Sequence, residues 1–320
     1  MVLHQKNDSF SSTTATAAAS NKVNHAFLDQ IELSTSTTVS SVEPTIVDIF
    51  PYGTKKGDLH AQGYYGVKVV HWIRHAQGFH NVGDARSRAN IDARLTPMGE
   101  SQCQALARKI QKAASSFSRY ADVLHNTEMI VTSPVTRCIQ TAILSLKPVL
   151  EKYEDVAVVA HECIRETVNF NCDRRRPINE IAIDFPLVDF SLCDTNEDAI
   201  WEYYESLLGD DEEFTENRES AEIHTIAERT RSFFEWLSQR PEEHVAVCCH
   251  ATVSRCIFNF GLSGGNTPTD VPQTLDTRLP EERMDIPVVN FCGDAKFAEA
   301  MRRDFQNCEL RSMVMAFKWR

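Results

Sequence analysis

Short apolar runs separated by amphipathic stretches make up most of this 320-residue chain. The clearest run, 67–73, is rich in β-branched residues and ends abruptly at Arg74-His75, which is typical of a buried strand that enters a polar loop. Further runs of the same character cover 128–132, 156–160, 244–249, 286–291 and 311–317. The sequence therefore predicts at least six short, buried strands.

Apolar positions recur at helical spacing between these strands. Thr96-Pro97 has the pattern of an N-cap followed by a first helical residue, and predicts one helix that continues to about Ser118. Ser133-Pro134 is interpreted in the same way, with a helix over 135–146, and a further helix is expected over 222–238. Strands that alternate with helices predict an α/β fold with a mostly parallel central sheet and helices on both faces.

In such sheets a functional site lies beyond the carboxyl ends of the strands. Four groups of polar residues follow predicted strands directly: His75, 133–137, 162–166 and His250. We therefore expect these groups to share one edge of the sheet.

The first 47 residues have a different composition from the rest, rich in Ser, Thr and Ala. They predict a flexible, disordered arm over 1–47, followed by one domain over 48–320. The arm has no Arg and includes acids, which favours a cytoplasmic location over an organellar transit peptide, although a targeting role stays open. No apolar run reaches the roughly 18 residues of a membrane span, so no membrane contact is expected.

The net charge of −12 argues against a protein that binds nucleic acid, so an anionic substrate would need a local basic pocket. The ten cysteines are scattered through apolar runs without C-x-x-C pairs, as expected for reduced, buried thiols.

Arg74-His75 is the centre of the chemical interpretation. A neutral imidazole attacks phosphorus when its other nitrogen is held by an acceptor. Arginines at two strand ends, Arg74 and Arg137, would clamp the phosphoryl oxygens, Asn81 would donate to the same group, and His250 would stabilise the transition state. Glu166 is the candidate general acid. Glu162, four residues earlier, is a competitor that the sequence does not separate from it.

The chain resembles the histidine phosphatase superfamily, in the phosphoglycerate mutase-like branch (branch 1). The resemblance is carried by 74–81 (RHAQGFHN), 95–99 (LTPMG), 133–142 (SPVTRCIQTA), Arg165-Glu166 and 248–251 (CCHA), in the family's order. Cys172-Asp173-Arg174-Arg175 and 305–309 resemble eukaryotic members of uncertain substrate.

This resemblance implies a phosphoglycerate mutase-like three-layer sandwich and a phosphohistidine at His75. It also implies phosphate binding by Arg74, Arg137 and His250, with Glu166 as proton donor. Ala76 and Gly78 depart from the family's usual Gly and Ser or Thr, which affects the shape of the phosphate loop and one hydrogen bond.

Other interpretations compete at several positions. Cys249 and Arg255 have the C-x5-R spacing of cysteine-dependent phosphatases, but no glycine lies between them. His71, His75 and His80 are candidate metal ligands, but no carboxylate is evident to complete a site, and His71 is interpreted as a core residue.

Three positions are candidate contacts for the substrate itself: Gly78, Arg174 and Arg175. The run 174–176 is either the wall of an anion pocket or a solvated surface.

The sequence thus predicts a phosphomonoester hydrolase that acts on a small phosphorylated substrate through a phosphohistidine, without metal or other cofactor. A phosphoglycerate-type mutase and a non-catalytic protein that binds a phosphorylated ligand are the alternatives. The substrate and the oligomeric state are left open.

Overall fold

The computed structural model describes residues 46–83, 90–208, 219, 223–259, 287–293 and 295–319. The predicted N-terminal arm lies outside these residues, except for Ile46 and Val47, which begin the first strand. Within the described residues, no helix is long and apolar enough to cross a membrane.

In the described part of the chain, eight strands form one sheet in the order β5-β4-β3-β6-β2-β8-β1-β7. All neighbouring pairs are parallel except those of β8, which is antiparallel to β1 and to β2. The strand bounds are β1 Ile46–Pro51, β2 Gly66–Arg74, β3 Met129–Thr132, β4 Ala157–Ala160, β5 Val188–Asp189, β6 His244–Cys249, β7 Asn290–Phe291 and β8 Leu310–Lys318. The expected mostly parallel α/β sheet is therefore confirmed.

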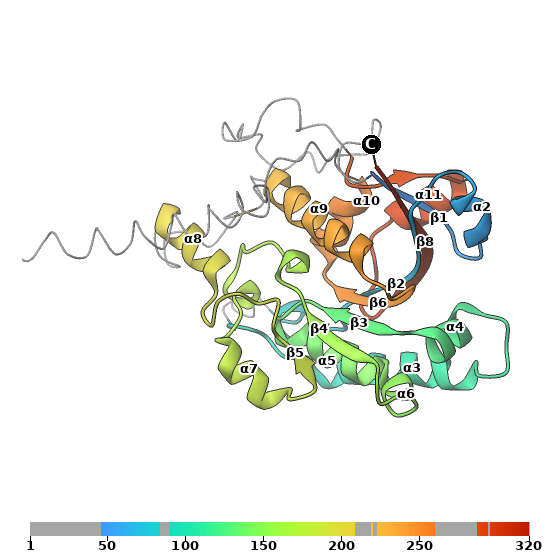
Figure 1. Ribbon diagram of the computed structural model, residues 1–320. Helices are drawn as coiled ribbons and strands as arrows, with labels where there is room; N and C mark the ends of the chain where they lie inside the picture. Colours follow the sequence, from blue (N-terminus) through green and yellow to red (C-terminus); the bar gives the residue numbers. More distant parts are fainter. Residues whose placement is uncertain are drawn as a thin grey trace, which may run out of the picture. The chain divides into compact units, whose positions relative to one another are not determined.

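Helices cover both faces of this sheet, as Figure 1 shows. One core contains β2, β3, β6 and β8 residues packed against α9, α10 and α11, and the other contains strand residues packed against α3 to α7. The helix bounds are α2 Lys56–His60, α3 Pro97–Lys112, α4 Arg119–Asn126, α5 Thr136–Ser145, α6 Lys147–Leu150, α7 Ile178–Asp184, α8 Ala199–Leu208, α9 Ile223–Gln239, α10 Ala251–Asn259 and α11 Ala295–Arg302.

The strands are continuous apolar runs in the sequence because both of their faces are buried. In β6, Val245 and Val247 point to the α9 side, while Ala246 and Cys248 point to the α5 side. Successive side chains of a strand face opposite ways, so a strand between two helical layers needs apolar residues at every position.

The predicted long helix is wrong in its second half. Helix α3 starts as expected at Pro97, with Thr96 as its N-cap accepting a hydrogen bond from Gly99 N, but it ends at Lys112. A turn follows, and Ser118 is not the end of α3 but the N-cap of α4. This break lets α4 turn back against the middle of β2 and the amino end of β6, where its residue Asp122 meets His71 and His244.

Two other local expectations differ from the structure. Ser133 does not cap α5, whose N-cap is Val135 without a side-chain hydrogen bond. The strand expected over 286–291 comprises only Asn290–Phe291 within the described residues. A strand of two residues leaves no periodic pattern, so its bounds could not be predicted.

The carboxyl ends of β4, β3, β6 and β2 lie at one edge because these four strands are parallel neighbours. His75 directly follows β2, Ser133 follows β3, and His250 follows β6. The predicted convergence of polar groups on one edge is thus a consequence of the sheet order.

The start of α3 supports the loop that follows β2. Thr96 N donates to the Gln77 carbonyl over 3.0 Å, and Gln77 N donates to Gln102 Oε1 over 2.9 Å. Gly99 lies so close that a Cβ there would be 2.1 Å from the Gln77 carbonyl oxygen. A side chain at position 99 would therefore push this loop away from the helix.

We predict that Gly99→Ala lowers the free energy of unfolding by about 1–3 kcal/mol, because the backbone must move to admit one methyl group. Gly57→Ala, in α2 with no atom near the added Cβ, is the matched control and should be neutral or slightly stabilising. Urea unfolding of both variants measures this. Equal stabilities would show that the Gln77 contact does not constrain position 99.

Candidate active site

His75 lies at the end of β2 with 2% of its surface exposed. Its Nδ1 is 2.7 Å from the carbonyl oxygen of Ala76. A carbonyl only accepts, so Nδ1 carries the proton and Nε2 keeps its lone pair. The backbone next to the ring thus selects the tautomer that a nucleophilic imidazole needs.

Burial lowers the pKa of His75 well below its ordinary value, and the positive charge of Arg137 lowers it further. The imidazole is therefore neutral at neutral pH. The pKa of His250 is lowered well below its ordinary value by the same causes, with burial first and Arg137 second. The two rings lie 5.2 Å apart, between centroids.

The backbone that carries His75 is held from two sides. Cys249 O accepts from His75 N over 2.8 Å, and Asn307 Nδ2 donates to His75 O over 3.1 Å. Arg74 Nη1 donates to the Phe305 carbonyl over 2.6 Å, which orients its guanidinium beside the nucleophile. The segment 305–309 is therefore part of the wall that supports the histidine loop.

Arg137, in the first turn of α5, is a fully buried cation. Its Nη1 donates to the Cys172 carbonyl over 2.5 Å, and its Nη2 donates to Asp173 Oδ1 over 3.0 Å. Nη2 also lies 3.3 Å from His250 Nδ1. Since guanidinium only donates, His250 Nδ1 accepts, and the proton of this ring is on Nε2.

His250 Nε2 donates to Ser133 Oγ over 2.8 Å. This contact explains why Ser133 does not cap α5: its hydroxyl is used by the histidine at the end of the neighbouring strand. The predicted helix cap at Ser133 was therefore wrong, because Ser-Pro before an apolar stretch is also the pattern of a helix start.

Glu166 lies at the N-terminus of α10. Its carboxylate accepts hydrogen bonds from Thr252 N over 3.2 Å and from Val253 N over 3.3 Å. The first backbone N–H groups of a helix have no partner within the helix, and its dipole favours an anion there. Glu166 also interacts electrostatically with Arg74 and Arg137, so it belongs to the same site as the two arginines.

Glu162, the competitor, has a different environment. Its Oε1 accepts from Arg175 Nε over 2.5 Å, and its Oε2 lies 3.4 Å from Arg165 Nη1. Both carboxylate oxygens are thus used by structural arginines. The geometry favours Glu166 over Glu162 as the acid–base residue.

The remaining predicted residues are placed as follows. Asn81 is exposed, and its Oδ1 accepts from Gly78 N over 3.0 Å. A Cβ on Gly78 would be 2.6 Å from His80 Nδ1, so the imidazole of His80 takes the space of the side chain usual at this position. The His80 and His75 rings lie 5.2 Å apart, which puts His80 next to the nucleophile.

The arginine run has mainly structural contacts. Arg175 is buried, and its N–H groups are occupied by Glu162 and by backbone carbonyls of 176 and 195–197. Arg174 packs over the Trp201 ring at 5.5 Å. Contact of either residue with a substrate stays a prediction, and the geometry offers Arg175 no free donor for it.

The geometry argues against Cys249 as the nucleophile of a cysteine-dependent phosphatase. Cys249 is fully buried as the last residue of β6, and burial raises the pKa of its thiol well above the ordinary value. Arg255 points to Asp304, with Nη2–Oδ1 at 2.9 Å. A protonated, buried thiol without its arginine is a poor nucleophile.

Asp173 is the residue that sequence reasoning did not single out. It is the only acid in ion-pair contact with Arg137 among the described residues, and it also accepts from Phe170 N over 3.2 Å. Arg137 and Asp173 are 36 positions apart, so no local pattern could have paired them.

Comparison with known proteins finds a family that is similar to part of this chain. Residues 70–186 match the family model of the histidine phosphatase superfamily (branch 1). A phosphoglycerate mutase-like protein of Arabidopsis thaliana is 29% identical over 279 residues, 78% of this chain and 84% of that protein. A probable phosphoglycerate mutase of Arthroderma benhamiae is 24% identical over 270 residues, 75% of this chain and 74% of that protein.

Among solved structures, the chain is similar to the ecdysone phosphate phosphatase of Bombix mori in complex with tungstate. The identity is 14% and the TM-score 0.40, over 77% of this chain and 88% of that one.

Burial raises the pKa of Asp173 to about 6, although Arg137 acts to lower it. An unfolded Asp titrates near 3.9, so the native state binds more protons than the unfolded state between these values, and Asp173 stabilises the fold more as the pH falls. We predict that the difference in unfolding free energy between wild type and Asp173→Asn moves in favour of the wild type from pH 7 to pH 5.

Urea unfolding at several pH values measures this difference, and Asp58→Asn, at an exposed position of α2, is the control. If the advantage of the wild type over Asp173→Asn in unfolding free energy shrank toward pH 5, the raised pKa of Asp173 would be contradicted.

Proposed function

We propose that the chain is a phosphatase of the histidine phosphatase superfamily (branch 1), whose family model matches residues 70–186, and that it hydrolyses small phosphomonoesters through a phosphohistidine at His75. The observation that carries the proposal is the hydrogen bond from His75 Nδ1 to the Ala76 carbonyl. This bond leaves the Nε2 lone pair as the nucleophile, in a ring that burial keeps neutral.

In the first step, His75 Nε2 forms a bond to phosphorus while the bond from phosphorus to the ester oxygen breaks. Glu166 in its acid form gives its proton to the departing oxygen, so an alcohol leaves. The imidazole carries the phosphoryl group on Nε2 and keeps its proton on Nδ1. This Nδ1–H donates to the Ala76 carbonyl, which stabilises the charge that develops on the ring.

In the second step, water attacks phosphorus and the bond from phosphorus to Nε2 breaks. The Glu166 carboxylate takes a proton from this water. The helix N-terminus that holds Glu166 stabilises the carboxylate between the two steps. Phosphate leaves, and the neutral His75 and the protonated Glu166 are restored.

Arg74 and Arg137 supply the electrostatic part of the scheme, and His250, which accepts from Arg137 and donates to Ser133, orients the Arg137 guanidinium. Phosphoryl transfer develops charge on the equatorial oxygens, and fixed donors stabilise it without rearrangement. The Nε protons of Arg74 and Arg137 have no hydrogen-bond acceptor among the described residues, which leaves them for a phosphoryl oxygen. Asn81 is proposed as a further donor from the loop after β2.

The names of the relatives support a second candidate, a mutase. Both compared proteins are named for phosphoglycerate mutase. A mutase would form the same phosphohistidine but return the phosphoryl group to another hydroxyl of the substrate instead of to water. The two candidates differ in the acceptor, so measuring free phosphate against rearranged ester separates them.

We predict that His75→Ala lowers the hydrolysis of an aryl phosphate by at least about 10³-fold, because the variant lacks the proposed nucleophile. Cys249→Ser, at a buried position beside it, is the control and should retain turnover. Wild type quenched in base should carry an acid-labile phosphoryl group that His75→Ala lacks. Loss of turnover in Cys249→Ser alone would support the cysteine mechanism.

The role of Glu166 predicts a dependence on the leaving group. Glu166→Gln should slow hydrolysis of an alkyl phosphate by about 10²–10⁴-fold, and of an activated aryl phosphate much less, because only a poor leaving group needs its proton. Glu162→Gln should instead lower stability without such selectivity, since Glu162 pairs with Arg165 and Arg175. Steady-state rates over a series of esters test this. Equal losses for both esters would exclude Glu166 as the acid.

A further inference from the structure

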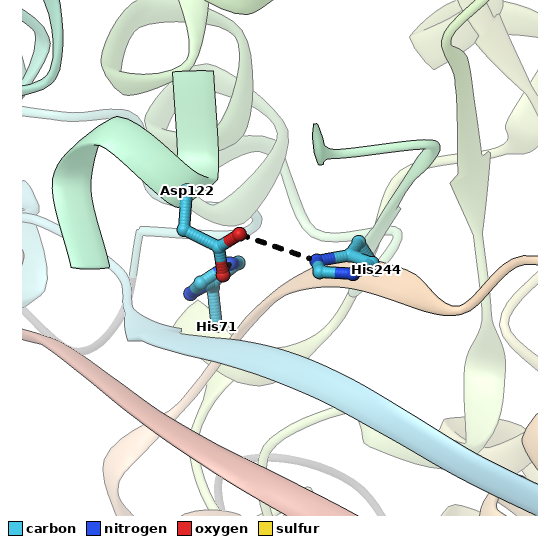
Figure 2. A group of neighbouring side chains, drawn as sticks. All are labelled: His71, Asp122 and His244. Carbon is cyan, nitrogen blue, oxygen red and sulfur yellow. Dashed lines mark ion pairs between the residues drawn. The ribbon is translucent and has the colours of Figure 1, made fainter. Parts of the chain in front are cut away.

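Two histidines and one aspartate meet at the end of the sheet opposite the candidate active site. His71 lies in the middle of β2, His244 is the first residue of β6, and Asp122 reaches them from α4, as Figure 2 shows. Their side chains are 0%, 20% and 11% exposed for His71, His244 and Asp122. Each offers one ligand atom, and the three atoms lie within 4.8 Å of one another.

Asp122 forms ion pairs with both histidines, and the pair with His244 is drawn as a dashed line in Figure 2. Asp122 Oδ2 is 3.3 Å from His71 Nε2, and Asp122 Oδ1 is 3.5 Å from His244 Nδ1. Within the described residues, His71 Nε2, Asp122 Oδ2 and His244 Nδ1 have no hydrogen-bond partner. The Asp122 carboxylate compensates both rings as an ion-pair partner, and a shared cation is a second arrangement that these atoms allow.

A tetrahedral metal ion would be compatible with the short distances between these side chains. Bonds of about 2.0–2.1 Å to zinc at tetrahedral angles place two ligand atoms about 3.3–3.4 Å apart. The ring lone pairs then point at the ion and not at the neighbouring ligand atom. One ligand atom from each of the three residues lies within 4.8 Å of the others, a spacing that one ion could bridge.

The surroundings of His71 suit metal binding. Its Nδ1 lies 2.9 Å from Ser312 Oγ on β8, a contact that fixes the ring and leaves Nε2 as the ligand atom. The Tyr52 ring lies 6.4 Å from the His71 ring.

We propose that His71, Asp122 and His244 bind one zinc ion or a similar divalent transition metal ion, with water at the fourth position. Two imidazoles and one carboxylate are ligands that zinc prefers. The carboxylate that sequence analysis could not find for a site at His71 comes from α4, across the break after α3.

This site is separate from the phosphoryl chemistry. His244 and His250 are six residues apart along one strand and its end, which corresponds to about 20 Å. The proposed ion would therefore fasten α4 to β2 and β6 and take no part in the reaction. Its removal should lower stability and leave the rate at His75 unchanged.

Lys56 contacts His244 and leads to a further prediction for metal binding. Its Nζ is 3.3 Å from His244 Nε2 and 2.8 Å from Glu243 Oε2. A metal on Nδ1 requires the His244 proton on Nε2, where it would face the ammonium group. Lys56 therefore competes with the metal ion. Replacing Lys56 by an uncharged residue should strengthen metal binding.

The test uses the full chain, freed of metal by a chelator and then titrated with zinc by calorimetry. The wild type should bind one equivalent that raises Tm by several degrees. His244→Gln and Asp122→Asn should lose this equivalent and the Tm shift, while Lys56→Gln should bind at least several-fold more tightly. His75→Ala and His60→Gln, away from the cluster, should keep it.

Cobalt in place of zinc gives an independent readout on the wild type, because tetrahedral cobalt sites absorb strongly in the visible range. We expect that absorption in wild type and Lys56→Gln, and its absence in His244→Gln with an unchanged circular dichroism spectrum. A wild type that binds no zinc at micromolar concentrations, or an equivalent that is lost in His75→Ala but kept in His244→Gln, would overturn the proposal.

Discussion

The buried guanidinium of Arg137 is the constraint on which the candidate active site depends. Its partners come from separate parts of the chain: the Cys172 carbonyl, the Asp173 carboxylate and His250. A buried charge is costly unless it is compensated, and the raised pKa of Asp173 shows that burial also disfavours its counter-charge. The same cation lowers the pKa of His75 and His250. Burial keeps both imidazoles neutral, and this fixed charge adds to that effect and favours an anion nearby.

The parts of this arrangement that the sequence predicted are those set by local pattern and by the sheet. Runs such as 67–73 and 244–249 identify strands because both faces are buried, and parallel strands bring His75 and His250 to one edge. The turn between α3 and α4 was missed because 113–118 has no glycine or proline to mark a break, although Ser118 is an ordinary N-cap.

Contacts between distant positions could not be predicted in this way. Glu162 and Glu166 are equivalent in the sequence, and they differ because two arginines hold the first while the end of α10 holds the second. Asp92 is a similar case: it accepts from Thr136 N over 2.7 Å, 44 positions away, and so stabilises the start of the helix that carries Arg137. Only the fold brings such pairs together.

The two ends of β6 show how the helices decide what a histidine does. The strand begins with His244 and is followed by His250, and nothing in its apolar pattern distinguishes one end from the other. At the amino end, α4 brings the carboxylate of Asp122, which favours a cation. At the carboxyl end, α5 brings the guanidinium of Arg137, which favours an anion. The sign of the charge that each helix contributes, and not the histidine, therefore determines which ligand each end of the strand would select.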